Sequence, residues 1–116
     1  MNRNELIETV KTMMNASSCC KELKDAGQKY LDSCGTADEK AAFDALTAEV
    51  KEDISTLEHA LEFYESPVAV RIFGAERAKA LADHSRARLA QGEKWCDCPA
   101  CAAGLKILEY AGIQLA

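Results

Sequence analysis

Apolar residues recur at steps of three and four along most of the chain, the spacing that lines one face of an α-helix. Leu6 and Val10 show it in the first segment, which predicts a helix over residues 4–16. A second helix is predicted over residues 18–33, because Ser17 and Ser18 can cap its start. The glycine of Cys34-Gly35 then ends that helix. These two helices should form a hairpin.

The middle of the chain predicts one long helix over residues 36–65. Thr36-Ala37-Asp38-Glu39 fits a capping box, in which the threonine oxygen accepts an amide of the first turn and the glutamate reaches back to the threonine amide. A single apolar seam then continues in steps of three and four. The residues of this seam are Phe43, Leu46, Val50, Ile54, Leu57, Leu61 and Tyr64.

Two more helices are predicted after Ser66-Pro67, because proline suits the first helical position. The first covers residues 67–73 and is broken by Gly74. The second covers residues 75–91 and ends at Gly92.

The last helix is predicted to start at Cys98, which can cap it, with Pro99 at its first position. No segment alternates well enough to be a strand. The predicted fold class is therefore all-α: a compact bundle of about five helices, with the 36–65 helix as its spine and a cysteine-rich turn before the C-terminal helix. The whole chain, 1–116, is expected to be a single helical domain.

Composition agrees with a packed globular protein, with 48% hydrophobic and 28% charged residues. A net charge of −5 and the lack of a long Lys/Arg run argue against nucleic-acid binding. No stretch approaches the roughly 20 apolar residues of a membrane span. The first residues are polar and resemble no secretory signal, so a cytoplasmic location is expected.

Six cysteines are the unusual feature of the composition. In a reducing cytosol, clustered cysteines are more often metal ligands or redox groups than disulfides. Cys96, Cys98 and Cys101 fall within six residues, at a turn leading into a helix. Thiolates are the ligands that zinc, copper(I) and iron–sulfur clusters prefer, and helix-start amides favour negative sulfur. The sequence therefore predicts a metal site here.

Three thiolates leave tetrahedral zinc one ligand short, and the start of the second helix is the best source of a fourth. Cys19 and Cys20 both precede Leu23 by about one turn. Neighbouring helical residues point about 100° apart, so only one of the pair is expected to join the site. Cys20 is slightly favoured because it lies further inside the helix. Cys34 is interpreted as a spare thiol.

Other chemistries compete with structural zinc. Spacing alone does not separate zinc from an iron–sulfur cluster. Cys98-Pro99-Ala100-Cys101 also matches the Cys-Pro-x-Cys pattern of glutaredoxin-like sites, although those follow an early strand. His59 is interpreted as part of a solvated face, and His84 is a less favoured fourth ligand. No nucleotide or catalytic motif occurs, so no catalytic residue is assigned.

Three motifs carry a resemblance to a known family: Ser18-Cys19-Cys20-Lys21-Glu22, Phe73-Gly74-Ala75-Glu76-Arg77-Ala78 and Cys96-Asp97-Cys98-Pro99-Ala100-Cys101-Ala102. On these the chain resembles a family of small uncharacterised helical proteins of anaerobic bacteria, some labelled after a large ATP-driven heat-shock chaperone. The chain is too short for such an ATPase and has no nucleotide motif. The resemblance implies a cytoplasmic location and a joint role of Cys19 or Cys20 with the later cysteines.

Three functions are therefore weighed. The first is a metal-stabilised binding module that meets an unknown protein partner or a second copy of the chain. The second is a thiol redox protein using Cys98 and Cys101. The third is a protein that stores or delivers a soft metal ion.

Overall fold

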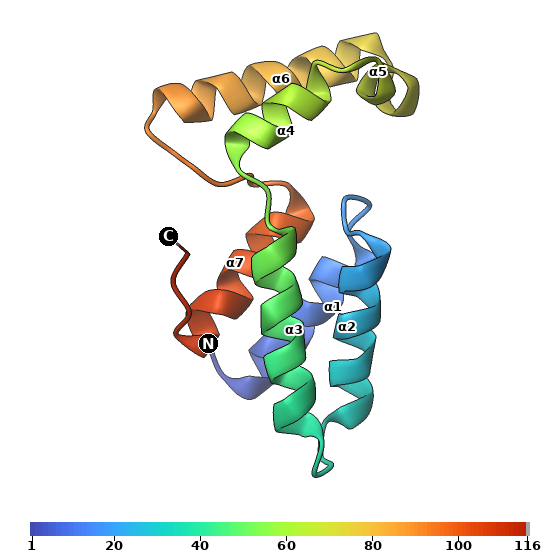
Figure 1. Cartoon of the computed structure of the whole chain (residues 1–116), viewed down its shortest axis with the longest axis vertical. Helices are drawn as coiled ribbons and strands as arrows, with labels where there is room; N and C mark the ends of the chain where they lie inside the picture. Colours follow the sequence, from blue (N-terminus) through green and yellow to red (C-terminus); the bar gives the residue numbers. More distant parts are fainter. Residues whose placement is uncertain (116) are drawn as a thin grey trace. The chain divides into compact units, whose positions relative to one another are not determined.

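The computed structural model describes residues 1–115, and within that range the chain forms seven α-helices and no β-strand (Figure 1). The helices are α1 (Arg3–Asn15), α2 (Lys21–Ser33), α3 (Glu39–Asp53), α4 (Leu57–Tyr64), α5 (Pro67–Phe73), α6 (Ala75–Ala90) and α7 (Pro99–Ala111). The all-α class is confirmed. The predicted number of about five helices was too low, mainly because the long central helix is divided.

The helices fall into two compact units. Unit 1 comprises Met1–Ile54 and the chain from Asp97 onward, and so contains α1, α2, α3 and α7. Unit 2 comprises Ser55–Cys96 and contains α4, α5 and α6. A single domain requires that the two units unfold cooperatively. The single domain expected from the chain length therefore stays a prediction.

Unit 1 is a closed arrangement of four helices. α1 packs against α2 and α7, and α3 packs against the same two helices. The large buried side chains of these helices include Leu6, Val10, Met13, Leu23, Tyr30, Leu46, Val50, Ile107 and Leu108. α7 approaches α3 closely at Gly104, where an added Cβ would lie 3.0 Å from Cγ1 of Val50. The core is thus formed by the apolar faces that the sequence predicts.

The predicted 36–65 helix is wrong in its middle, where α3 ends at Asp53 and α4 begins at Leu57. Thr56 caps α4 by accepting a hydrogen bond from the His59 N–H at 3.2 Å. The backbone N–H of Leu57 donates to the Lys94 carbonyl oxygen at 2.8 Å, so this N–H has a partner outside α4. The apolar seam hides this break because its spacing continues through residues 54–57.

Two predicted helix starts also differ from the structure. α2 is preceded by Cys20 rather than capped by Ser17 or Ser18, and Cys20 makes no side-chain cap bond. α3 begins at Glu39, whose carboxylate accepts from the Gly35 N–H at 2.7 Å. The predicted capping box is therefore wrong: the N-cap of α3 is Asp38, which makes no side-chain cap bond, and Glu39 reaches back to Gly35 instead of Thr36. The chain turns at Gly35, which has a φ of 82°.

Unit 2 packs α4, α5 and α6 against one another. Pro67 starts α5 as predicted, and Ser66 caps it by accepting a hydrogen bond from the Ala69 N–H at 3.4 Å. The rings of Phe63, Tyr64 and Phe73 form a cluster with edge-on and tilted contacts. This cluster joins the two shorter helices of the unit.

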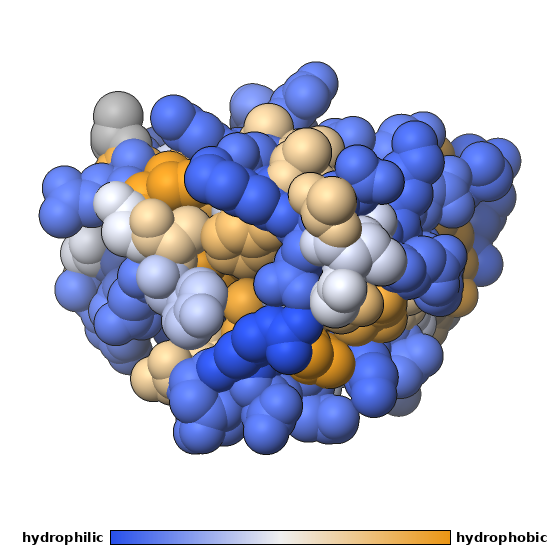
Figure 2. Space-filling view, turned by 90° about the horizontal axis from the view of Figure 1, so that it is seen from below, coloured by the Kyte–Doolittle hydropathy of each residue, from blue (hydrophilic) through white to orange (hydrophobic). Residues whose placement is uncertain are grey.

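Polar side chains cover most of the face shown in Figure 2, and apolar residues appear there as separate patches. Over residues 1–115, no helix combines the length and the apolar character needed to cross a bilayer.

Candidate metal centre

The start of α7 forms the base of the site. Cys98 is the N-cap, Pro99 is the first helical residue, and both positions are as predicted. The Sγ of Cys98 accepts a hydrogen bond from the Cys101 N–H at 3.4 Å. Sulfur thus takes the place that an oxygen fills in most helix caps. A negatively charged Cys98 would gain from this bond and from the helix dipole.

Cys96, Cys98 and Cys101 bring their sulfurs together, with all Sγ atoms within 4.8 Å of one another. A tetrahedral zinc ion with Zn–S bonds of about 2.3 Å holds its sulfurs about 3.8 Å apart. Side-chain rotations that change the distances between the sulfurs by roughly 1 Å would therefore suffice to bring all three to one ion. Cys96 and Cys101 are buried and Cys98 is half-buried. The donor set and its spacing fit a soft metal ion.

Cys96 is held by backbone pairing within unit 2. Its N–H donates to the Ser55 carbonyl at 2.9 Å, and the preceding residue, Trp95, forms an isolated antiparallel bridge with Thr56. The ammonium of Lys94 lies 5.0 Å from the centre of the Trp95 ring. These contacts fix the backbone immediately before the cysteine cluster.

The loop between α1 and α2 reaches the first turn of α7. Ser18 Oγ accepts a hydrogen bond from the Ala100 N–H at 3.4 Å. The next residue, Cys19, is only 7% exposed, and its Sγ lies 3.6 Å from the Cys20 carbonyl oxygen. Burial raises the pKa of the Cys19 thiol, the positive charge of Lys24 lowers it, and negative charge at Asp53 and Cys98 raises it.

Cys20 lies in a different environment. It is exposed, and its thiol donates to a carboxylate oxygen of Asp53, at the end of α3, at 3.4 Å. Partial burial is the main cause that raises the pKa of Cys20, and its bond with Asp53 raises it further. The group of converging sulfurs found among the described residues contains neither Cys19 nor Cys20. The pairing of Cys20 with Asp53 had no signal in the sequence, because it depends on how α2 packs against α3.

The other candidate ligands are not part of the group of converging sulfurs found among the described residues. Cys34 is half-buried at the end of α2, where it forms a hydrogen bond with the Tyr30 side chain. His59 and His84 are both exposed, and neither belongs to the group of potential ligands formed by the cysteines. The interpretation of His59 as part of a polar face agrees with its exposure.

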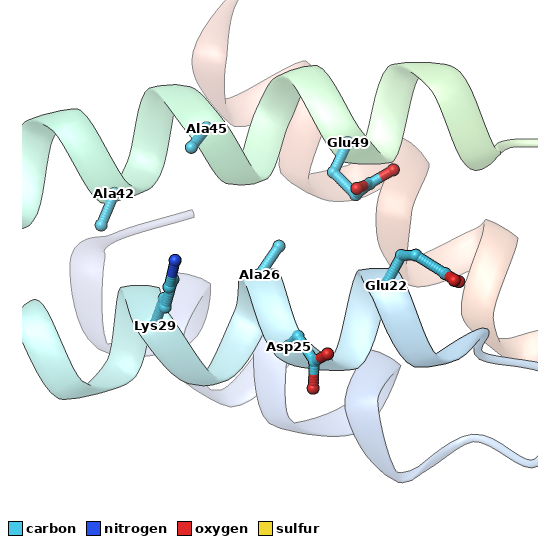
Figure 3. Close-up of a pocket in the computed structure, with 7 residues that line it drawn as sticks. All are labelled: Glu22, Asp25, Ala26, Lys29, Ala42, Ala45 and Glu49. Carbon is cyan, nitrogen blue, oxygen red and sulfur yellow. The ribbon is translucent and has the colours of Figure 1, made fainter.

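A groove of about 360 Å³ lies between α2 and α3 (Figure 3). Its lining residues are Glu22, Asp25, Ala26, Lys29, Ala42, Ala45 and Glu49. The short alanine side chains leave the hollow, and the charged side chains extend from both helices around it. A hydrogen bond with Asp53 is the main cause that raises the pKa of Glu49, followed by desolvation and nearby acidic charges. The groove contains none of the cysteines.

No protein-family model matches this chain, and no curated protein or solved structure is significantly similar to it. The chemistry of the site therefore follows from its own residues. Three thiols that converge at a helix start can bind a metal ion. The same donors suit zinc and iron–sulfur clusters, so their geometry does not select between the two.

Proposed function

We propose that the protein is a small helical binding module stabilised by a structural zinc ion at Cys96, Cys98 and Cys101. The convergence of these three sulfurs within 4.8 Å carries the proposal. Zinc is preferred because it needs no redox partner and commonly binds cysteines near a tight turn followed by a helix. The fourth ligand comes from the Cys19–Cys20 pair.

A structural role follows from how little secondary structure holds the cysteine segment. An isolated bridge and several backbone bonds, rather than a helix, fix the chain before α7. Structural zinc sites supply about 10–16 kcal/mol of apparent binding energy, whereas whole domains are stable by about 5–15 kcal/mol. Zinc would therefore decide whether this part of the fold is ordered.

The biological role proposed is recognition rather than catalysis. Exposed apolar side chains on α5 provide contact surface for a partner. These side chains are Val68, Val70 and Ile72. The partner would be another protein or a second copy of this chain, in the cytoplasm. Nucleic acid and membrane are not proposed as partners.

A thiol redox function is the second candidate, and one observation favours it. Cys98 is half-buried at the start of α7, where its sulfur accepts the Cys101 N–H, as expected for an activated thiol. The two thiols would form a disulfide while a substrate disulfide takes up two electrons and two protons and becomes two thiols. The third converging sulfur, at Cys96, has no task in that reaction.

Metal content and an absorption spectrum test the proposal, on protein purified without air and without a metal-binding tag. We expect a single zinc ion per chain and no visible colour. Brown protein containing iron and sulfide would replace zinc with an iron–sulfur cluster. Protein without metal that does not bind added zinc would overturn the proposal in favour of thiol redox chemistry. Several soft ions per chain would instead indicate metal storage or delivery.

A further inference from the structure

We propose that Cys19, and not Cys20, is the fourth ligand, so that the metal ion joins the loop between α1 and α2 to the start of α7. The inference rests on the proposed metal site and completes it. Spacing in the sequence slightly favours Cys20, whereas three structural observations favour Cys19.

The first observation is that the residue before Cys19 is bonded to the first turn of α7. Ser18 Oγ accepts a hydrogen bond from the Ala100 N–H at 3.4 Å, and Ala100 lies between the two cysteines of the α7 start. The residue after Ser18 is therefore held beside the first turn of α7. Cys19 thus follows directly a residue that is bonded to the helix start carrying Cys98 and Cys101.

The second observation is the state of the Cys19 side chain. It is 7% exposed, similar to Cys96 at 5% and Cys101 at 9%. Its thiol donates to the Cys20 carbonyl oxygen at 3.6 Å, and because a thiol is a weak donor this bond costs little to give up. A structural zinc site is closed to solvent, so a buried fourth thiol suits it better than an exposed one.

The third observation removes Cys20 from the site. Its thiol is exposed and donates to the Asp53 carboxylate at 3.4 Å. Cys20 is the N-cap of α2 and has extended backbone angles with φ −73° and ψ 162°. Cys20 therefore contacts the end of α3, whereas Ser18, on the other side of Cys19, contacts the start of α7.

Charge supports the assignment as well. Four thiolates around Zn²⁺ leave a net charge of about −2, which needs nearby positive groups. The α7 amides provide partial positive charge, including the Cys101 N–H already bonded to Cys98. Lys24, one turn into α2, adds a full positive charge that acts on Cys19.

The test compares the adjacent variants Cys19→Ser and Cys20→Ser after replacement of zinc by Co²⁺. The sulfur-to-cobalt absorption reports the number of bound thiolates. We expect Cys20→Ser to keep the wild-type spectrum and Cys19→Ser to lose the intensity of one thiolate. In competition with a chelator, Cys19→Ser should lose more affinity than the roughly 10–100-fold typical of an outer-shell contact.

A second measurement needs no variant that has to fold. Zinc-loaded wild-type protein is treated with a thiol alkylating reagent, and the modified cysteines are located by mass spectrometry. We expect rapid labelling of Cys20 and no labelling of Cys19, followed by accelerated labelling of Cys19 once zinc is removed. Equal labelling of Cys19 with and without zinc would overturn the assignment.

The outcomes separate this inference from the proposed function. Wild-type protein that binds no metal overturns both. Metal-bound protein whose cobalt spectrum changes in Cys20→Ser but not in Cys19→Ser overturns only the assignment of Cys19. A spectrum that changes in neither variant also overturns that assignment and leaves a site with three thiolates.

Discussion

The hydroxyl oxygen of Ser18 accepts a hydrogen bond from the backbone N–H of Ala100, 3.4 Å away. That N–H belongs to the first turn of α7, where amides have no acceptor within the helix. Cys98 Sγ provides an acceptor for the next amide along, that of Cys101. The first turn of α7 is therefore capped partly by its own N-cap and partly by a residue far away in the sequence.

Ser18→Ala should lower the free energy of unfolding by about 1 kcal/mol, because the Ala100 N–H then loses its acceptor. Chemical denaturation of the zinc-loaded protein measures this. Ser17→Ala is the matched control, since Ser17 is exposed and adjacent. If both substitutions lower the free energy of unfolding equally, the hydrogen bond between Ser18 and Ala100 makes no contribution of its own to stability.

Cys101→Ser should abolish stable zinc binding and strongly lower the thermal stability, because the buried Cys101 is one of the three converging sulfurs. Zinc content and circular dichroism on heating check both effects. Cys34→Ser removes a cysteine outside the cluster and should keep the wild-type zinc content. A Cys101→Ser protein that retains both fold and metal contradicts a site built on four thiolates.

Stability should fall in acid partly through Glu39. Its hydrogen bond with Arg3, and then that with the Gly35 N–H, hold the pKa of the Glu39 carboxyl below its ordinary 4.5 in the folded state. The resulting stabilisation is present above pH about 4.5 and disappears as the pH falls through the lower folded pKa. Denaturation midpoints measured between neutral and acid pH report it.

Arg3→Met should flatten this acid dependence, because it removes the main cause of the lowered Glu39 pKa. Lys11→Met is a control that removes a positive charge elsewhere on α1. The interpretation fails if both variants show the same pH dependence as the wild type.

Tyr30 should ionise above the ordinary range of a tyrosine in the folded chain. Its ring is 2% exposed, and burial, followed by the hydrogen bond with Cys34, raises its pKa to about 12. The stabilisation that comes from burying neutral Tyr30 is present below pH about 10 and is lost as the pH rises through about 12. Tyrosinate absorbance followed during alkaline titration measures this step.

Tyr30→Phe should remove the absorbance step near pH 12. Tyr110→Phe is the control, since Tyr110 is 42% exposed. A late step that survives in Tyr30→Phe and disappears in Tyr110→Phe would belong to Tyr110 and would contradict the prediction.

Local patterns predicted most helices, including α5 and the N-cap and first residue of α7. They failed at residues 54–56, where the apolar spacing continues but the helix stops. The break depends on backbone bonds from Ser55 and Leu57 to residues near Trp95, a pairing distant in sequence. Periodicity reports which face is apolar and cannot show such a pairing.

In the candidate metal centre, too, local features were predicted from the sequence and features that depend on helix packing were not. The convergence of Cys96, Cys98 and Cys101 follows from their closeness in sequence and was predicted. The environments of Cys19 and Cys20 differ, because Cys19 is buried whereas Cys20 is exposed and donates to Asp53. Neighbouring residues with the same side chain are distinguished only once the packing of helices is known.

The bridge between Thr56 and Trp95 brings together the two ends of unit 2. α3 and α7 pack against each other in unit 1, although all of α4, α5 and α6 comes between them in the chain. The entropy lost in closing a loop grows with its length. If unit 2 forms early, its paired ends shorten the effective loop between α3 and α7. Closing that loop then costs about as much entropy as closing a loop of a few residues.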